Sequence, residues 1–127
     1  MSIKFKVIER GEPGVVGGGT KKYYASANIT GEATIEKLTR RIEKISTVSG
    51  ADIRAVLYAL VDVAVEELAD GKAVRFDDLG SLRVSLSSSG VEKESDVTPA
   101  IITKSKVIFT PGKKIKEMLN NVKYEKM

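Results

Sequence analysis

Residues 75–90 read "RFDDLGSLRVSLSSSG", and the order of their side chains predicts two strands joined by a bend at residues 79–81. After the bend, apolar and polar residues alternate with the period of a half-buried strand. The apolar face consists of Leu82, Val84 and Leu86. The opposite face carries serines and a single cation, Arg83. A sheet that binds nucleic acid is expected to carry more positive charge than this, so the partner of the polar face is the question that the stretch raises.

The composition narrows the class of protein. The chain has 127 residues, of which 42% are hydrophobic but only 6% are aromatic, and there is no Trp. A single subunit of this size buries roughly two-thirds of its unfolded surface, so a core shared with a second subunit would help. The absence of Cys and His removes disulfides, thiolates, the commonest general base and the commonest metal ligand. The sequence therefore predicts no enzyme, no cofactor, no metal and no small-molecule substrate.

The basic residues are concentrated at the two ends of the chain. The net charge is +4, with +3 on residues 1–30, −2 on residues 31–90 and +3 on residues 91–127. This distribution is compatible with an anionic partner. No apolar run approaches the ~20 residues of a membrane span, and the start, "MSIKFKVIER", lacks the apolar core of a signal peptide. We expect a cytoplasmic protein with no membrane partner.

Two helices are expected before the bend. Residues 34–46 repeat apolar residues on one helical face, and three cations beside that stripe, Arg40, Arg41 and Lys44, are interpreted as a solvated face. Residues 49–69 form the stronger helix, with Ser49 as its N-cap and Gly71 as its left-handed stop. The apolar surface of this second helix is wide enough to require burial on more than one side. A partner subunit is the simplest source of the second side.

The rest of the chain is expected to form strands at 72–77, 81–88 and 101–109, followed by a helix that starts at Pro111. The polar stretch at 88–99, "SSGVEKESDVTP", is interpreted as a projecting loop or arm. Lysines crowd the first turns of the last helix, where the helix dipole disfavours cations. They are either phosphate contacts or an ordinary soluble helix start. The pair Asp77-Asp78 fits a turn better than a metal site, since adjacent strand residues point to opposite faces.

The first 30 residues are expected to add two short strands, at 3–8 and within 21–30. The glycine-rich stretch between them, "GEPGVVGGGT", is interpreted as a loop or flexible linker. It lacks the ending of a phosphate-binding loop.

Three segments together resemble the HU/IHF family of small bacterial DNA-architectural proteins, over residues 34–120. "TVSGADIRAVLYALVDVAVEEL" is similar to the start of the family's dimer-forming helix. In "ADGKAVRFDDLGSLRV", Leu79, Gly80 and Leu82 stand where the family has Phe, Gly and Phe. "KVIFTPGKKIKEML" resembles the closing strand and final helix, with Phe109 as the core aromatic. The first 30 residues resemble the N-terminal extension of an enlarged HU-like subgroup, and we expect this extension to pack on its own subunit or to add a strand to the sheet.

The resemblance implies an α+β, HU/IHF-like fold, in which a helical base carries a three-stranded antiparallel sheet with a protruding β-arm. It also implies an intertwined homodimer, with an extra N-terminal strand segment in residues 1–30 and a DNA-binding domain in residues 31–127. Its implied function is nucleoid-associated binding of double-stranded DNA through the backbone and minor groove, with little sequence specificity. The expected DNA-binding residues are Arg83, Lys104, Lys106, Lys113, Lys114 and Lys116. The expected dimer-core residues are Leu57, Leu60, Val61, Ala64, Leu79, Leu82 and Phe109.

The arm departs from the family pattern. The family's arm is rich in Arg and has a proline near its tip, whereas this chain has three serines at 87–89 and the acidic residues Glu92, Glu94 and Asp96. Pro99 lies on the returning side, where we interpret it as the start of an irregular strand. These departures motivate an alternative hypothesis: a structural or protein-interaction dimer that has the HU fold and weak or no DNA binding.

Overall fold

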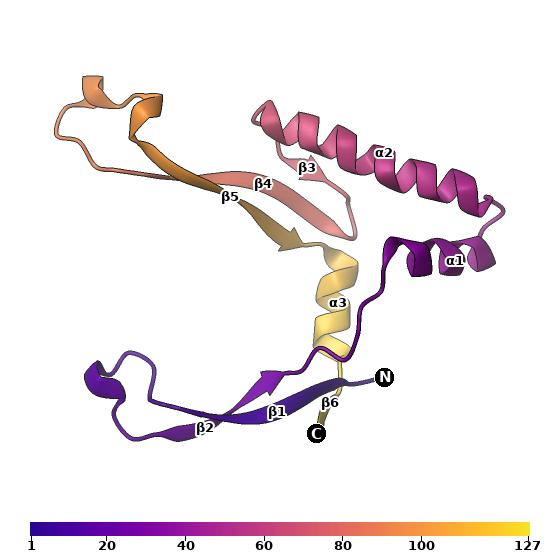
Figure 1. Cartoon of the computed structure of the whole chain (residues 1–127), viewed down its shortest axis with the longest axis horizontal. Helices are drawn as coiled ribbons and strands as arrows, with labels where there is room; N and C mark the ends of the chain where they lie inside the picture. The colour runs from indigo at the N-terminus through magenta and orange to yellow at the C-terminus, as the bar shows by residue number, and fades with distance from the viewer. The chain divides into compact units, whose positions relative to one another are not determined.

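The computed structural model describes residues 1–127 and has a mixed α+β architecture of three α-helices and two three-stranded sheets (Figure 1). The chain divides into two compact units. One comprises Ile35–Met118, and the other combines Met1–Thr34 with Leu119–Met127. Each unit is described separately below.

The larger unit begins with two helices, α1 (Ile35–Ile45) and α2 (Gly50–Ala69), that pack against each other. Ser49 is the N-cap of α2, as expected, and its hydroxyl accepts a hydrogen bond from the backbone N–H of Asp52 at 3.3 Å. The Glu43 carboxylate accepts a second hydrogen bond, from the backbone N–H of Gly50 at 3.1 Å. Gly71, with φ +83°, ends the helix in the expected left-handed conformation. Both ends of α2 are therefore set by local sequence.

The sheet of this unit has the order β3 (Val74–Arg75), β4 (Gly80–Ser88) and β5 (Ile102–Pro111), and every pairing is antiparallel. The bend before β4 requires glycine at position 80, where φ is +144°. A Cβ there would contact the carbonyl oxygen of Thr110 and lie 2.7 Å from the Phe109 ring. The predicted reversal is present, but its turn lies at residues 77–79 rather than 79–81, because Gly80 and Ser81 already pair within β4.

The same bend supports the start of α3 (Lys113–Asn121). The backbone N–H groups of Gly112 and Lys114 donate to the carbonyl oxygens of Leu79 and Asp78, at 3.0 and 3.1 Å. The turn role expected for residues 77–78 is therefore confirmed. The expected helix start at Pro111 is wrong, because Pro111 still pairs with Gly80 as the last residue of β5.

The smaller unit holds its own sheet of order β2–β1–β6, made of β1 (Ile3–Arg10), β2 (Lys22–Ala27) and β6 (Tyr124–Lys126). The N-terminal strands do not add to the β3–β4–β5 sheet, which was one of the two expected arrangements. They pair instead with β6, a parallel strand near the end of the chain that the sequence did not predict. The glycine-rich stretch is a hairpin loop between β1 and β2 rather than a linker.

Few side chains are buried in the single chain. Among non-glycine residues, only Thr39, Ile53 and Ala64 are less than 9% exposed. The apolar surface of α2 is open, with Leu60 at 43% and Val61 at 55% exposure. No helix is long and apolar enough to cross a lipid bilayer. The chain alone therefore does not enclose the core that its hydrophobic content could form.

Candidate nucleic-acid interface

Three of the expected DNA-binding residues share one face of the β4–β5 hairpin. The register pairs Ser85 with Lys106 and Ser87 with Lys104, and Arg83 lies two residues before Ser85 on β4. Partners in an antiparallel ladder lie on the same face, and alternate residues of a strand return to it. The polar face that begins with Arg83 therefore acquires two lysines from the neighbouring strand.

The structure adds a fourth cation to this face, Arg75, which the sequence analysis did not single out. Arg75 on β3 pairs with Ser81 on β4, so it has the same orientation as Arg83. Its position between Val74 and Phe76 was the available signal, because alternation already placed it on the polar side of the strand. With Arg75, all three strands of the sheet contribute cations to one face.

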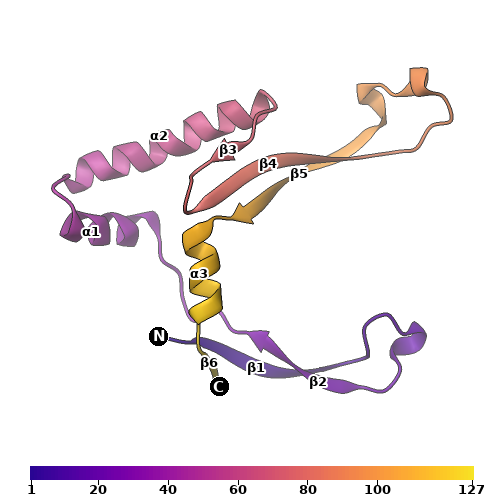
Figure 2. The same cartoon turned by 180° about the vertical axis from the view of Figure 1, so that it is seen from behind.

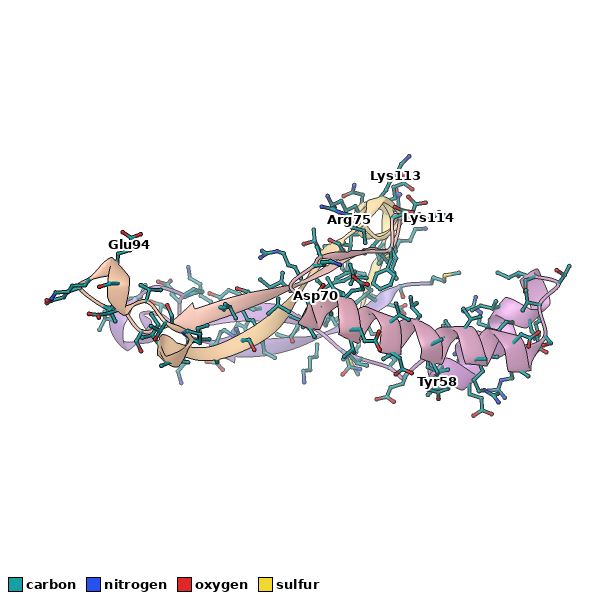
Figure 3. The ribbon with its side chains drawn as sticks, turned by 90° about the horizontal axis from the view of Figure 1, so that it is seen from above. Tyr58, Asp70, Arg75, Glu94, Lys113 and Lys114 are labelled. Atoms are coloured by element: carbon teal, nitrogen blue, oxygen red, sulfur yellow. The ribbon has the colours of Figure 1, made fainter.

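A shallow hollow of about 200 Å³ connects this face to the start of α3. Its lining residues are Arg75, Asp77, Gly80, Ser81, Thr110, Pro111 and Gly112. Lys113 and Lys114 follow directly, and the view from above shows both beside Arg75 (Figure 3). Lys116 lies further along the same helix, with its backbone N–H bonded to the Gly112 carbonyl oxygen at 3.0 Å. The expected lysines of α3 thus begin where the sheet face ends.

None of these seven cations forms an ion pair. Ion pairs elsewhere in the chain join Lys4 to Glu125, Lys22 to Glu12, and Lys72 to both Glu67 and Asp70. The cations of the sheet face and of α3 are all exposed. Their charges are therefore available to an external anion.

Two ion-paired groups elsewhere in the chain, Lys72 and Glu125, have shifted pKa values. A hydrogen bond from Lys72 to Asp70, reinforced by the charge of Glu67, raises the pKa of Lys72 above its usual value. A hydrogen bond from Lys4, followed by one from the Ser2 hydroxyl, lowers the pKa of Glu125. These shifts mark local pairing rather than a catalytic group, and no group of three or more acidic residues is placed to hold a metal ion.

The far end of the β4–β5 hairpin has the opposite charge. A β-bulge interrupts the register after Ser87, where Thr103 donates a hydrogen bond to the Ser87 carbonyl oxygen at 3.2 Å. Beyond it the chain forms two 3-10 turns, Glu94–Asp96 and Pro99–Ile101, visible from behind in Figure 2. Pro99 opens the second turn, which leads into β5 as expected for an irregular strand start. Glu94 lies at the end of the hairpin that is far from Arg75 (Figure 3).

The apolar side of the unit gathers four of the seven expected dimer-core residues. Leu60, Val61, Ala64 and Leu82 line an open apolar pocket of about 200 Å³, together with Val65, Leu68 and Phe76. Leu57, Leu79 and Phe109 are not part of this pocket. Leu79 and Phe109 are about half exposed, at 51% and 46%.

Comparisons with known proteins identify the family of the chain. Residues 1–126 match a family model described as "HU domain fused to wHTH, Ig, or Glycine-rich motif", named HU-HIG. The chain belongs to the HU-HIG family. The match includes the N-terminal hairpin and β6 as well as the larger unit, so both units are part of what the HU-HIG model describes.

A solved structure has the same fold. The HU-HIG chain resembles a crystal structure described as a "Putative bacterial DNA binding protein" from Bacteroides vulgatus ATCC 8482, with a TM-score of 0.69 and 16% sequence identity. The alignment covers 99% of this chain and 48% of that one, so the chain spans about half the length of its structural neighbour. The comparison with curated proteins gave no significant match.

Proposed function

We propose that this HU-HIG chain binds double-stranded DNA through the cationic sheet face and the start of α3. The proposal rests on the strand register, which places four cations on one face of the sheet: Arg75, Arg83, Lys104 and Lys106. None of the four is in an ion pair. Lys113 and Lys114 extend this face onto the helix. An anion with regularly spaced charges, such as a phosphate backbone, matches such a row of free cations.

The chemistry of the face favours backbone contact over base reading. Lysine and arginine neutralise phosphates, and the hydroxyls of Ser85 and Ser87 can donate hydrogen bonds to phosphate oxygens between them. The face lacks Asn and Gln, which pair with adenine edges, although Arg and Lys could also contact guanine. We therefore propose a nucleoid-associated, architectural role with little sequence specificity, carried by residues 31–127.

We further propose that the binding unit is a homodimer. The apolar surface of α2 and the apolar side of β4 are open in the single chain, and Leu60 and Val61 are about half exposed. Apolar area of this extent is normally covered in a soluble protein, and a second copy covers it with a matching surface. The HU/IHF resemblance implies the same intertwined pairing.

The β4–β5 hairpin would then act as an arm with a restricted contact zone. Its base carries the cations, whereas Glu92, Glu94 and Asp96 at its end would repel phosphates. We propose that DNA contacts the base and middle of the arm and that the acidic end stays away from the backbone. A wedge role for Pro99 does not follow from its place on the returning side.

A salt titration of DNA binding tests the interface. With about six phosphates neutralised by each subunit in contact, log affinity should fall with log salt at a slope near −5 per subunit, or about 0.9 per phosphate. Replacing Lys104 and Lys106 by Gln should flatten this slope by roughly 1.8 for each subunit in contact with the DNA. The matched control, Arg40→Gln with Lys44→Gln, removes the same charge from α1, outside the sheet.

The outcome separates the two hypotheses. Mixed-sequence, bent and nicked duplexes should all shift at micromolar protein and low salt. If none of them shifts, the alternative of a structural or protein-interaction dimer with the HU fold is favoured. If the α1 control flattens the slope as much as the sheet variant, the sheet face is the wrong surface.

A dilution series tests the dimer independently of DNA. Because folding and association are coupled when subunits share a core, the unfolding midpoint should rise with protein concentration. Sedimentation should show a species of twice the 13.8 kDa chain mass. A monomer with a concentration-independent midpoint would contradict the proposed dimer.

A further inference from the structure

The β1–β2 hairpin in the smaller unit has one apolar face and one basic face. The register Phe5–Ala27 and Val7–Ala25 defines the apolar face. On the other face lie Lys4, Lys6, Ile8 and Arg10 of β1, with Lys22, Tyr24 and Ser26 of β2. This basic face belongs to a segment with a net charge of +3 over residues 1–30.

Two cations of the basic face oppose each other at an energetic cost. Arg10 and Lys22 are direct cross-strand partners, and like charges in such pairs destabilise a hairpin. Glu12 offsets part of this cost through an ion pair with Lys22 at 2.8 Å. Lys6 and Arg10 have no ion pair and are exposed. A basic face kept at this cost is suited to an external anion.

The loop of this hairpin is held together by backbone hydrogen bonds and close glycine packing. The backbone N–H of Glu12 donates to the Gly18 carbonyl oxygen at 2.6 Å, and that of Gly18 donates to Val15 at 3.0 Å. Gly11 packs so closely on Gly18 that a Cβ at position 11 would lie 2.7 Å from the Gly18 oxygen. The four left-handed glycines of the loop are Gly14, Gly17, Gly18 and Gly19. This geometry fixes the loop in a closed turn.

The closed turn presents two neighbouring valines to solvent, and Val16 is the more exposed of them. Val16 is fully exposed, at 102%, and Val15 beside it is 46% exposed. A Cβ at Gly14 or Gly17 would have nothing within 4 Å, so the loop is open to solvent at both of these glycines. A valine in a glycine-rich loop, which has few other side chains, fits a narrow groove. The minor groove of DNA is about 6 Å wide. Architectural proteins use apolar side chains of this kind to open a base step.

We propose that the β1–β2 hairpin is a second DNA-contacting element, in which Lys6 and Arg10 bind phosphates and Val16 enters the minor groove. The inference rests on the proposed DNA binding by the chain and assigns part of it to the hairpin. The charge contrast supports DNA as the occupant: the β1–β2 hairpin has a basic face and an apolar tip, whereas the β4–β5 loop is acidic.

The phosphate contacts are tested by single neutralisations on the two faces of one sheet. Lys6→Gln should flatten the salt slope by about 0.9 for each hairpin in contact with the DNA, and one such contact narrows the affinity ratio between 50 and 200 mM salt by about 3.5-fold. Adding Arg10→Gln should raise this effect to about 12-fold. The matched control is Lys126→Gln, because Lys126 pairs with Phe5 on the opposite face. Its slope should equal that of the unaltered chain.

The wedge is tested by DNA bending. A duplex labelled at both ends should show end-to-end energy transfer on binding that Val16→Ser reduces, with the salt slope unchanged. The control is Val97→Ser, since Val97 is also an exposed valine, at 61%, in the β4–β5 loop. Neither valine supports a core, and thermal melting of each variant checks that the fold is kept.

The results distinguish this inference from the proposed function. If the unaltered chain binds no DNA, the proposed function fails and the hairpin assignment fails with it. If the chain binds and the Lys104–Lys106 variant flattens the slope, but Lys6→Gln and Val16→Ser behave like the unaltered chain, only the hairpin assignment is overturned. That second result would leave an acidic protein surface as the occupant of the basic face.

Discussion

Adding lysines to the serine strand should increase DNA binding if the register defines the contact surface. Ser85 and Ser87 lie on the same face as Lys106 and Lys104, directly across the ladder. Each Ser→Lys substitution places one more cation on that face. If each new cation meets one phosphate, the double variant steepens the salt slope by about 1.8 for each subunit in contact, and one such subunit widens the affinity ratio between 50 and 200 mM salt about 12-fold.

The same change should lower the stability of the hairpin. Each new lysine faces an existing lysine across the strands, and such like-charge pairs cost about 0.2–1 kcal/mol each. The double variant should therefore lose roughly 0.4–2 kcal/mol of unfolding free energy without DNA. A better-folded sample would bind DNA more tightly and also be more stable. Tighter binding together with lower stability would therefore point to the added lysines.

The assay is fluorescence anisotropy of a labelled mixed-sequence duplex at four or more salt concentrations, paired with denaturant unfolding of the free protein. Ser105→Lys is the matched control, because Ser105 pairs with Leu86 on the apolar face of the same two strands. Ser105→Lys adds the same charge to the same hairpin, but on the opposite face. If Ser105→Lys steepens the slope as much as Ser85→Lys, or if Ser85→Lys leaves the slope unaltered, the reasoning from register to DNA contact is refuted.

Three further predictions concern the scaffold. Gly80→Ala should lower the unfolding free energy by at least about 1–3 kcal/mol, because the left-handed backbone is strained for alanine and its Cβ would meet the Phe109 ring; a loss below about 0.5 kcal/mol in denaturant unfolding would contradict this. Glu43→Ala should cost about 1 kcal/mol at the start of α2, and Glu43→Gln, which keeps an acceptor, should cost less in the same measurement. The pKa of Glu125 is lowered in the folded state, so its pairing with Lys4 stabilises above the ordinary carboxyl pKa and is lost as pH falls through the lower folded value; the protection of the β6 amides, taken relative to the exchange rate of an unstructured chain at the same pH, should fall on acidification, and Glu125→Gln should abolish that dependence.

The features that local pattern controls were predictable from the sequence. The alternation after the bend gave both faces of β4, and the glycine at position 80 was expected because the chain must reverse there. The caps of α2 at Ser49 and Gly71 follow from short-range hydrogen bonding and left-handed backbone. These signals act within a few residues, so a single sequence carries them fully.

The features that the sequence did not reveal depend on distant partners. β6 has only three residues, and its strand conformation comes from pairing with Ile3–Phe5 at the other end of the chain. Pro111 was assigned to the helix because proline suits a first helical turn, but a pairing with Gly80 keeps it in β5. Arg75 was missed for a related reason: its contribution to the polar face requires the β3–β4 register, which alternation in one strand does not supply.

The serines that first argued against DNA binding have a physical reason to be there. A lysine opposite another lysine costs stability, whereas a serine opposite a lysine leaves that lysine free for a phosphate and adds a hydroxyl donor beside it. Lys104 and Lys106 both face serines in this way. The acidic end of the β4–β5 hairpin then confines the proposed contact to the base and middle of the arm, so Val97, although exposed, is not expected to reach the DNA. We therefore assign bending by this chain to another apolar side chain, Val16, which is fully exposed in the loop of the hairpin that carries the basic face.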